Sequence, residues 1–263
     1  MPGIELELLT SQQAGRLQSE GRVVGLIGTG AVEQHGPHLP LGTDAIIARH
    51  LASEIAARLQ EIVLVAPVLP GGMSSHHLAF PGTVDLAGEL FAGYVRALLA
   101  AMDRLGIRDI ALFSAHGGNF ARLAELAAEY DGHGRLRVVA YTDIWQYIEV
   151  MSAAAERTGL HAVACDAHAG ALETSQMLFL HGPGRISFEP GLEGYVAAEP
   201  GWMERLAAEG IDALSANGVL GRPADATAEA GAAICAALAD TLAAWMAQEL
   251  GLERPRVTAS ASQ

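Results

Sequence analysis

The sequence contains no lysine, so all sixteen basic residues among its 263 are arginines. Without a lysine amine, the chain cannot form a Schiff base with a carbonyl substrate, anchor pyridoxal phosphate or act as a Ser-Lys hydrolase. It also lacks the lysine with which a P-loop contacts nucleotide phosphates. Lysine-based covalent catalysis and P-loop nucleotide hydrolysis are therefore excluded.

Positive charge of any kind is scarce. Thirty acidic residues give a formal net charge of −14, and the sequence has no basic run. Proteins that bind nucleic acid neutralise its phosphates with clustered basic residues. Nucleic acid is therefore not expected as a partner.

Cysteine is nearly absent, with only Cys165 and Cys235 present. Their separation matches neither the disulfide framework of a small secreted protein nor the closely spaced pairs of a zinc or redox site. Both are expected to pack as small apolar side chains.

The sequence gives no sign of a targeting or membrane segment. Glu5 and Glu7 precede the first arginine, at position 16, whereas a signal peptide begins with basic residues. The most apolar stretch, residues 230–247, is shorter than a membrane span and contains Asp240. We expect a cytoplasmic protein without membrane contact, in which this stretch forms a helix buried against other helices or a partner subunit.

Short β-rich runs alternate with longer helical segments, and 51% of the residues are hydrophobic. This alternation is typical of an α/β fold in which helices cover both faces of a mainly parallel sheet. Strands are expected at residues 22–27, 62–66, 109–113 and 136–141, with a weaker candidate at 186–188. Residues 1–256 are expected to form a single domain and residues 257–263 a flexible tail.

Two helices are indicated by apolar residues at four-residue spacing. One series is Ile47, Leu51, Ile55 and Leu59, and the other is Leu86, Leu90, Tyr94, Leu98 and Met102. Further helices are expected at residues 120–130, 145–157, 171–181 and 227–250.

Three segments without regular periodicity follow predicted strands, at residues 28–44, 67–83 and 114–119. Open α/β sheets place ligands at the carboxyl ends of their strands. A fourth irregular segment, residues 161–170, leads into the helix that contains Glu173. These four segments are therefore the expected location of the functional residues.

The first irregular segment contains Glu33, His35 and Asp44. It is unlike a dinucleotide-binding loop, because Glu33 stands in place of the third glycine and no helix can follow at once. Two residues apart on extended chain, Glu33 and His35 point to the same side, and Asp44 can return to them at the start of the next helix. Such donors suit Zn²⁺, Mn²⁺ or Fe²⁺, although a solvated polar loop is an equal alternative for this segment alone.

The run Ser114-Ala-His116-Gly-Gly-Asn119 follows a buried-strand pattern and precedes a helix. Two glycines after a histidine allow close backbone approach to a ligand. His116 is expected at the same sheet edge as Glu33 and His35, which favours a metal site over a histidine packed in the core. Taken alone, Glu173 is explained better as an acid that complements its helix dipole.

Four motifs occur in order along the chain. They are Glu33-Gln-His35-Gly-Pro-His-Leu-Pro with Asp44, Phe80-Pro-Gly-Thr83, His116-Gly-Gly-Asn119, and His168-Ala-Gly170 followed by Glu173-Thr-Ser175. Together they resemble the creatininase family of metal-dependent amidohydrolases, over about residues 22–182. The resemblance implies a three-layer α/β/α sandwich and an assembly of identical subunits, with a hexamer favoured.

The resemblance also implies two divalent ions per subunit, with Zn²⁺ favoured and Mn²⁺ or Fe²⁺ as the alternatives. One ion would be bound by Glu33 and His116. The other would be bound by His35 and Glu173, and Asp44 would bridge both.

Contact with substrate is expected from His77, Gly117, Gly118 and Trp145. Gly118 stands where creatininase itself supplies a metal-binding glutamate, which weakens the expectation of creatinine as substrate. His76 likewise stands where many relatives of this family carry glutamate.

The reaction implied by the resemblance is hydrolysis of an amide, lactam or formamide by hydroxide formed on the two-metal centre, with His168 protonating the leaving nitrogen. The chain would then be a hydrolase of carbon–nitrogen bonds other than peptide bonds, acting on a small amide-type substrate. Two alternatives stay open: a two-metal peptidase or lactonase of the same family, and a metal-binding homologue without catalysis.

Overall fold

A computed structural model gives the structure of the chain and describes residues 3–19, 21–132, 134–184, 186 and 191–253. These residues form a five-stranded sheet in the order β1-β3-β2-β4-β5, in which every neighbouring pair is parallel. The strands are β1 (Ile4–Glu5), β2 (Val23–Thr29), β3 (Ile62–Val65), β4 (Asp109–Ser114) and β5 (Arg137–Ala140). The predicted parallel sheet is confirmed.

Strand β2 lies at the centre of the sheet, and all seven of its residues are buried. Val24 and Leu26 pack into the apolar cluster on one face of the sheet, and Val23 and Ile27 pack into the cluster on the other. A strand buried on both faces needs apolar residues at successive positions, as the sequence supplies here.

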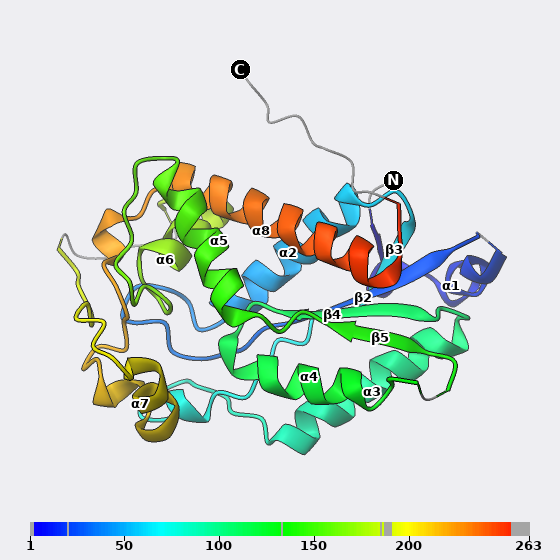
Figure 1. The fold of residues 1–263 in the computed structure, drawn as a ribbon, viewed down its shortest axis with the longest axis horizontal. Helices are drawn as coiled ribbons and strands as arrows, with labels where there is room; N and C mark the ends of the chain where they lie inside the picture. The colour runs from blue at the N-terminus through cyan, green and yellow to red at the C-terminus, as the bar shows by residue number, and fades with distance from the viewer. Residues whose placement is uncertain (1–2, 20, 133, 185, 187–190, 254–263) are drawn as a thin grey trace.

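Helices form a layer on each face of the sheet (Figure 1). On one face lie α2 (Thr43–Arg58), α5 (Ile144–Glu156), α6 (Ala171–His181) and α8 (Ala228–Leu250). On the other face lie α3 (Gly88–Arg104) and α4 (Phe120–Ala128), and two shorter helices are α1 (Ser11–Arg16) and α7 (Trp202–Glu209). The fold is the expected three-layer α/β/α sandwich.

Helix α8 is long and apolar enough to cross a membrane, judged by length and composition alone. In the structure it packs against α2, α5 and α6, and 56% of its most apolar window is buried. The core helix of a globular protein has this composition, as expected for residues 230–247.

Most of the second predicted apolar series lies on a helix, α3, and Met102 of that series is buried, but the series does not follow the buried face throughout. Leu90 and Tyr94 are 63% and 41% exposed, whereas Phe91, Val95 and Leu99 are buried. A strict four-residue repeat drifts around a helix of 3.6 residues per turn. The drift brings Leu90 and Tyr94 to the exposed side of α3, whereas the first series, Ile47, Leu51, Ile55 and Leu59, is buried throughout.

Some elements were not expected or cannot be compared. Strand β1 and helices α1 and α7 are short and carry no periodic pattern long enough to predict them. The weak strand candidate at 186–188 falls mostly outside the described residues, as does the tail at 257–263. The single domain at residues 1–256 stays a prediction.

A close approach between β2 and α2 brings the first irregular segment back to the sheet edge. A Cβ atom on Gly30 would lie 2.5 Å from the backbone nitrogen of Ala45, so only glycine fits there. Asp44 therefore enters the first turn of α2 directly beside the end of β2. Gly30 therefore allows the helix to pack on the strand, whereas a Cβ atom on Gly28 would meet the Phe113 ring of β4.

Candidate metal centre

Three segments at the carboxyl end of the sheet bring acidic and imidazole side chains to one place. Glu33 and His35 follow β2, His116 follows β4, and Asp44 and Glu173 lie in the first turns of α2 and α6. The structure brings these five predicted ligands together. Glu33, His35 and Asp44 form a group that could hold a metal ion, and the other such groups among the described residues each include His76, His77 or His168.

Asp44 lies between the two histidines of this cluster. Its Oδ1 atom is 3.0 Å from Nε2 of His35, and its Oδ2 atom is 3.3 Å from Nδ1 of His116. A glutamate completes each side: Glu173 Oε2 lies 3.7 Å from His35 Nε2, and Glu33 Oε1 lies 3.2 Å from His116 Nδ1. Each half of the cluster therefore contains one imidazole and two carboxylates, with Asp44 shared.

Backbone carbonyls fix the orientation of both imidazoles. His116 Nε2 lies 3.0 Å from the Met73 carbonyl, and His35 Nδ1 lies 3.1 Å from the Glu33 carbonyl. A carbonyl can only accept a hydrogen bond, so these nitrogens donate and the opposite nitrogens face the carboxylates. Metal-binding histidines are commonly held in this way.

The charges in the cluster suit a bound cation. Burial opposes protonation of His35 and His116, but the neighbouring carboxylates outweigh it, raising the pKa of His35 to about 10 and that of His116 well above its usual value. Among the described residues, Oε2 of Glu33 and Oδ2 of Asp44 are buried without a hydrogen-bond partner. Buried carboxylate oxygens need a partner, and a divalent cation would satisfy both.

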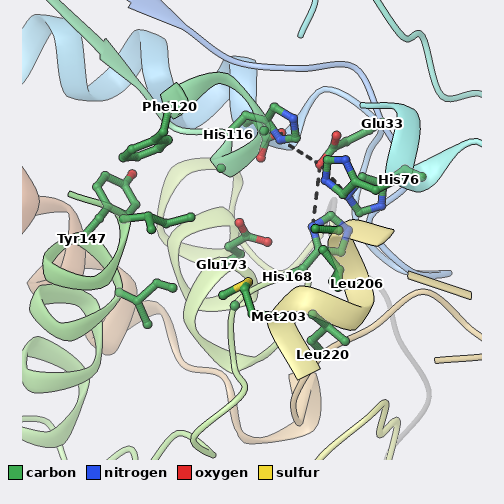
Figure 2. Close-up of a pocket in the computed structure, with 18 of the residues that line it drawn as sticks. Glu33, His76, His116, Phe120, Tyr147, His168, Glu173, Met203, Leu206 and Leu220 are labelled. Atoms are coloured by element: carbon green, nitrogen blue, oxygen red, sulfur yellow. Dashed lines mark ion pairs between the residues drawn. The ribbon is translucent and has the colours of Figure 1, made fainter. Parts of the chain in front are cut away.

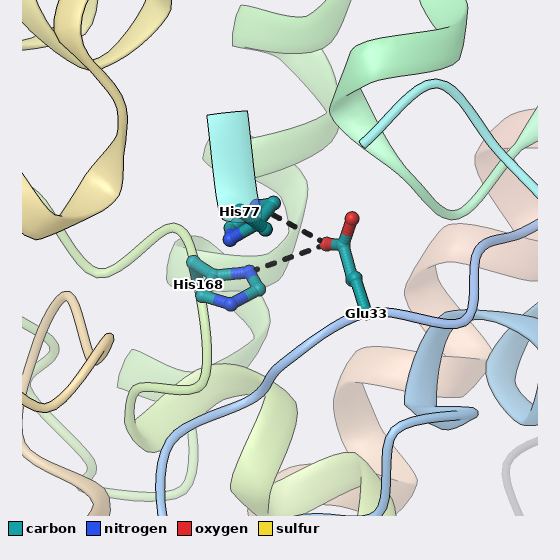
Figure 3. Close-up of side chains that lie close together, drawn as sticks. All are labelled: Glu33, His77 and His168. Carbon is teal, nitrogen blue, oxygen red and sulfur yellow. Dashed lines mark ion pairs between the residues drawn. The ribbon is translucent and has the colours of Figure 1, made fainter. Parts of the chain in front are cut away.

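His168 lies beside Glu33 and is neutral (Figure 3). Its Nε2 atom donates to the Gln34 carbonyl at 2.8 Å, so Nδ1 is the unprotonated nitrogen, 3.7 Å from Glu33 Oε1. Burial, helped by the charges of His35 and His77, holds the pKa of His168 well below its usual value. His168 can therefore accept a proton at Nδ1.

Gln34 is a functional candidate that the sequence analysis missed, although it stands between Glu33 and His35. Its side-chain oxygen accepts from the Gly36 amide at 2.9 Å, and its side-chain nitrogen lies 2.8 Å from His77 Nδ1 and 3.2 Å from the Gly218 carbonyl. His77 Nδ1 must then accept, which leaves the proton on Nε2, 3.3 Å from Glu33 Oε1. Gln34 thus connects both histidines beside Glu33, a role that spacing in the sequence could not reveal.

The loop before α6 holds Glu173 in place. Ala169 adopts a left-handed backbone conformation, with φ of 52°, and its amide donates to Glu173 Oε2 at 2.6 Å. Asp166 accepts from the amides of Ala171 and Leu172 and so caps the start of the helix. A strained residue beside a functional group is typical of active sites.

A cavity of about 290 Å³ opens above the cluster (Figure 2). Of the predicted substrate contacts, His77, Gly117 and Gly118 line it. Trp145 is 59% exposed and is not among the lining residues, so its contact with substrate stays a prediction. A Cβ atom on Gly118 would collide with the Met73 carbonyl and His116 Nε2, so glycine preserves the hydrogen bond that orients His116.

The amino-acid sequence matches a known protein family and several of its characterised members. The creatininase family profile, described as creatinine amidohydrolase, matches residues 7–246. A mycofactocin precursor peptide peptidase of Mycobacterium tuberculosis is 32% identical over 246 residues, covering 86% of this chain and 87% of that protein. Creatinine amidohydrolase of Pseudomonas putida is 28% identical over 173 residues, covering 61% of this chain and 65% of that protein.

A solved structure supports the fold. A crystal structure of creatinine amidohydrolase (creatininase) matches with a TM-score of 0.77 at 24% identity, over 95% of this chain and 99% of that chain. At this identity, the likeness shows the fold alone.

Proposed function

The chain belongs to the creatininase family of hydrolases, and we propose that it is a two-metal amidohydrolase that acts on the carbon–nitrogen bond of a small amide, lactam or formamide other than a peptide bond. The observation that carries this proposal is the position of Asp44, whose two oxygens face two differently held imidazoles. A single carboxylate placed in this way can be shared by two cations.

The proposed ligands divide into two sets. Glu33 and His116 would hold one ion, His35 and Glu173 the other, and Asp44 would contact both. Two divalent ions would lower the pKa of a shared water toward neutrality and polarise the substrate carbonyl. The mixed oxygen and nitrogen donors favour Zn²⁺, with Mn²⁺ or Fe²⁺ as the alternatives.

His168 is proposed to move the proton in this reaction. Its Nδ1 atom is unprotonated and faces the cluster, while Nε2 is held by the Gln34 carbonyl. His168 would accept a proton from the attacking water at Nδ1 and return it to the leaving nitrogen. Because the ring is anchored through its other nitrogen, it need not rotate between the two transfers.

Peptide-bond hydrolysis is the second candidate, because the chain is 32% identical over 86% of its length to a protein named as a peptide peptidase. The same residues would carry it, since a peptide bond is also an amide. A blocked dipeptide and a simple amide with the same acyl group distinguish the two activities by their relative kcat/KM.

Chelation followed by metal replacement tests the proposal. The purified protein is stripped with a chelator, reloaded with Zn²⁺, Mn²⁺ or Fe²⁺, and assayed on a formamide, a lactam, a simple amide, a lactone and a short peptide. We expect turnover of an amide-type compound that chelation abolishes and one of the ions restores. Metal binding without turnover of any of these compounds would favour the non-catalytic alternative.

Location and assembly complete the proposal: a cytoplasmic protein that forms a homo-oligomer, with a hexamer favoured. The exposed apolar side chains of Leu90 and Tyr94 on α3 are consistent with a covered surface in such an assembly. Light scattering on the purified protein measures the number of subunits.

A further inference from the structure

The cavity above the metal ligands has two chemically different ends (Figure 2). Glu33, His76 and His116 lie at one end, Phe120 and Tyr147 lie at the other, and Glu173 lies between them. We call the apolar part of the lining the apolar half. It comprises Phe120, Tyr147, Ile148 and Met151, together with Met203 and Leu206 of α7, which Figure 2 shows nearer to Glu173 and His168 than to Phe120 and Tyr147.

The apolar half offers no partner for an anionic ligand group. Among the described residues that line the cavity there is no arginine, and the chain contains no lysine. Its one phenol stays neutral, because burial and the charge of Glu173 raise the pKa of Tyr147 well above its usual value. A carboxylate or phosphate placed there would lose its hydration without gaining a counter-charge.

Helix α7 supplies one wall of this half although none of its residues is buried. It lies between Gly201 and Gly210, which both have positive φ, and it packs mainly against η3 (Ser75–His77) and η5 (Ile211–Ala213). Met203 and Leu206 are only partly covered by protein, and both line the cavity. Apolar side chains in this position gain burial when an apolar group fills the cavity.

The size of the cavity limits the occupant. About 290 Å³ is near the lower limit of the roughly 300–1,000 Å³ usual for ligand pockets. One small group fits, whereas a long polymer does not.

From these observations we infer that the apolar half binds a neutral aromatic ring or branched aliphatic group, carried by an amide whose carbonyl lies at the metal end. This inference rests on the proposed function, which it deepens by naming the class of substrate. It predicts discrimination against substrates that carry a carboxylate or phosphate at this position.

Binding of hydroxamates tests the inference without relying on turnover, because the hydroxamate group chelates divalent ions and leaves its substituent free. Calorimetry on the Zn²⁺-loaded protein compares acetohydroxamate, phenylacetohydroxamate and the monohydroxamate of succinic acid. We expect phenylacetohydroxamate to bind about ten-fold more tightly than acetohydroxamate, because the ring is buried. The succinic compound should bind no more tightly than acetohydroxamate.

Two variants test whether the tighter binding of the phenyl compound depends on the apolar half. Leu206→Glu changes a residue of α7 that is not buried, so the fold should survive, and it should remove the gain from the phenyl ring while leaving acetohydroxamate affinity within about two-fold. The matched control Leu8→Glu, at an exposed leucine that does not line the cavity, should change neither affinity. Equal binding of the methyl and phenyl compounds, or a gain that persists in Leu206→Glu, would overturn this inference alone. Failure of every hydroxamate to bind would overturn the proposed metal centre as well.

Discussion

The Oδ2 atom of Asp44 lies 3.3 Å from Nδ1 of His116, and among the described residues it is buried without a hydrogen-bond partner. The other oxygen of the same carboxylate faces His35. A buried carboxylate that serves only the fold would normally satisfy both oxygens within the protein. Within the part of the chain that the structure describes, the buried Oδ2 atom of Asp44 lacks a hydrogen-bond partner, and a bound cation would supply the missing interaction.

Asp44→Asn is expected to reduce the bound metal from two ions per subunit to one or none, because the amide lacks the charge that both ions would share. Mass spectrometry of the metals after dialysis measures this number, and circular dichroism checks the fold. The matched control is Asp109→Asn, at the opposite end of β4, where the carboxylate pairs with Arg22. Two ions retained in Asp44→Asn would refute the shared carboxylate.

Metal affinity is expected to rise with pH. In the metal-free protein His35 carries a proton, because its neighbouring carboxylates outweigh burial and raise its pKa to about 10. A cation must displace this proton, so below that pH the affinity should rise about ten-fold per pH unit for each proton released. Burial also raises the pKa of Glu173 to about 7, so the slope should steepen below that value.

A chelator competition for Zn²⁺ at several pH values between about 6 and 8 measures this slope. A dissociation constant that does not change over this range would show that the ion displaces no proton from His35.

His168→Ala is expected to lower kcat by roughly 10²–10⁴-fold while both ions stay bound, because the residue moves a proton and is not proposed as a ligand. Steady-state kinetics and metal analysis on the same sample give the two readouts. His161→Ala, an exposed histidine in the preceding loop, serves as the control. Full activity in His168→Ala would show that another group moves the proton.

Gln34→Leu is expected to lower kcat by about 10–100-fold with little loss of metal, as is usual for groups that orient residues at a metal site. Leucine cannot donate to His77 Nδ1 or to the Gly218 carbonyl, so His77 loses its fixed orientation, whereas the backbone carbonyl that accepts from His168 is kept. The control is Gln12→Leu, on the exposed surface of α1. If Gln34→Leu instead loses metal in proportion to activity, its role is to hold Glu33.

The sequence predicted the parts of this molecule that depend on local pattern. Apolar runs gave the four long strands, and the rule that ligands bind at strand carboxyl ends brought Glu33 and His116 to one edge. Asp44 was predicted there because it stands at the start of the next helix, and the structure adds the reason that it reaches the sheet, which is the close packing of Gly30 on α2.

What the sequence could not predict depends on contacts between distant segments. The connection from Gln34 to His77 joins loops that follow different strands, and no spacing shows which side-chain atoms meet. The apolar face of α3 was predicted only in part, since Met102 is buried as the series requires, whereas Leu90 and Tyr94 fit the repeat but are exposed and Phe91 and Val95 are buried instead. Helix α7, which forms one wall of the cavity, has only three large apolar residues, Trp202, Met203 and Leu206, and so short a series does not predict a helix.

A pair of Gly→Ala substitutions tests how tightly α6, which carries Glu173, packs on α8. A Cβ atom on Gly231 of α8 would collide with the Ser175 carbonyl of α6, whereas one on Gly93 of α3 would meet no atom within 4 Å. Both glycines lie in helices, where alanine by itself is favoured by about 0.5–1 kcal/mol.

Gly93→Ala should therefore raise the melting temperature slightly, and Gly231→Ala should lower it, because forcing the helices apart costs about 1–3 kcal/mol. The shift of α6 should also weaken metal binding at the half of the cluster that contains Glu173. Thermal unfolding and metal titration of both variants check this. A Gly231→Ala protein as stable as Gly93→Ala would mean that α6 and α8 can separate without cost, and that Glu173 is held by its own loop alone.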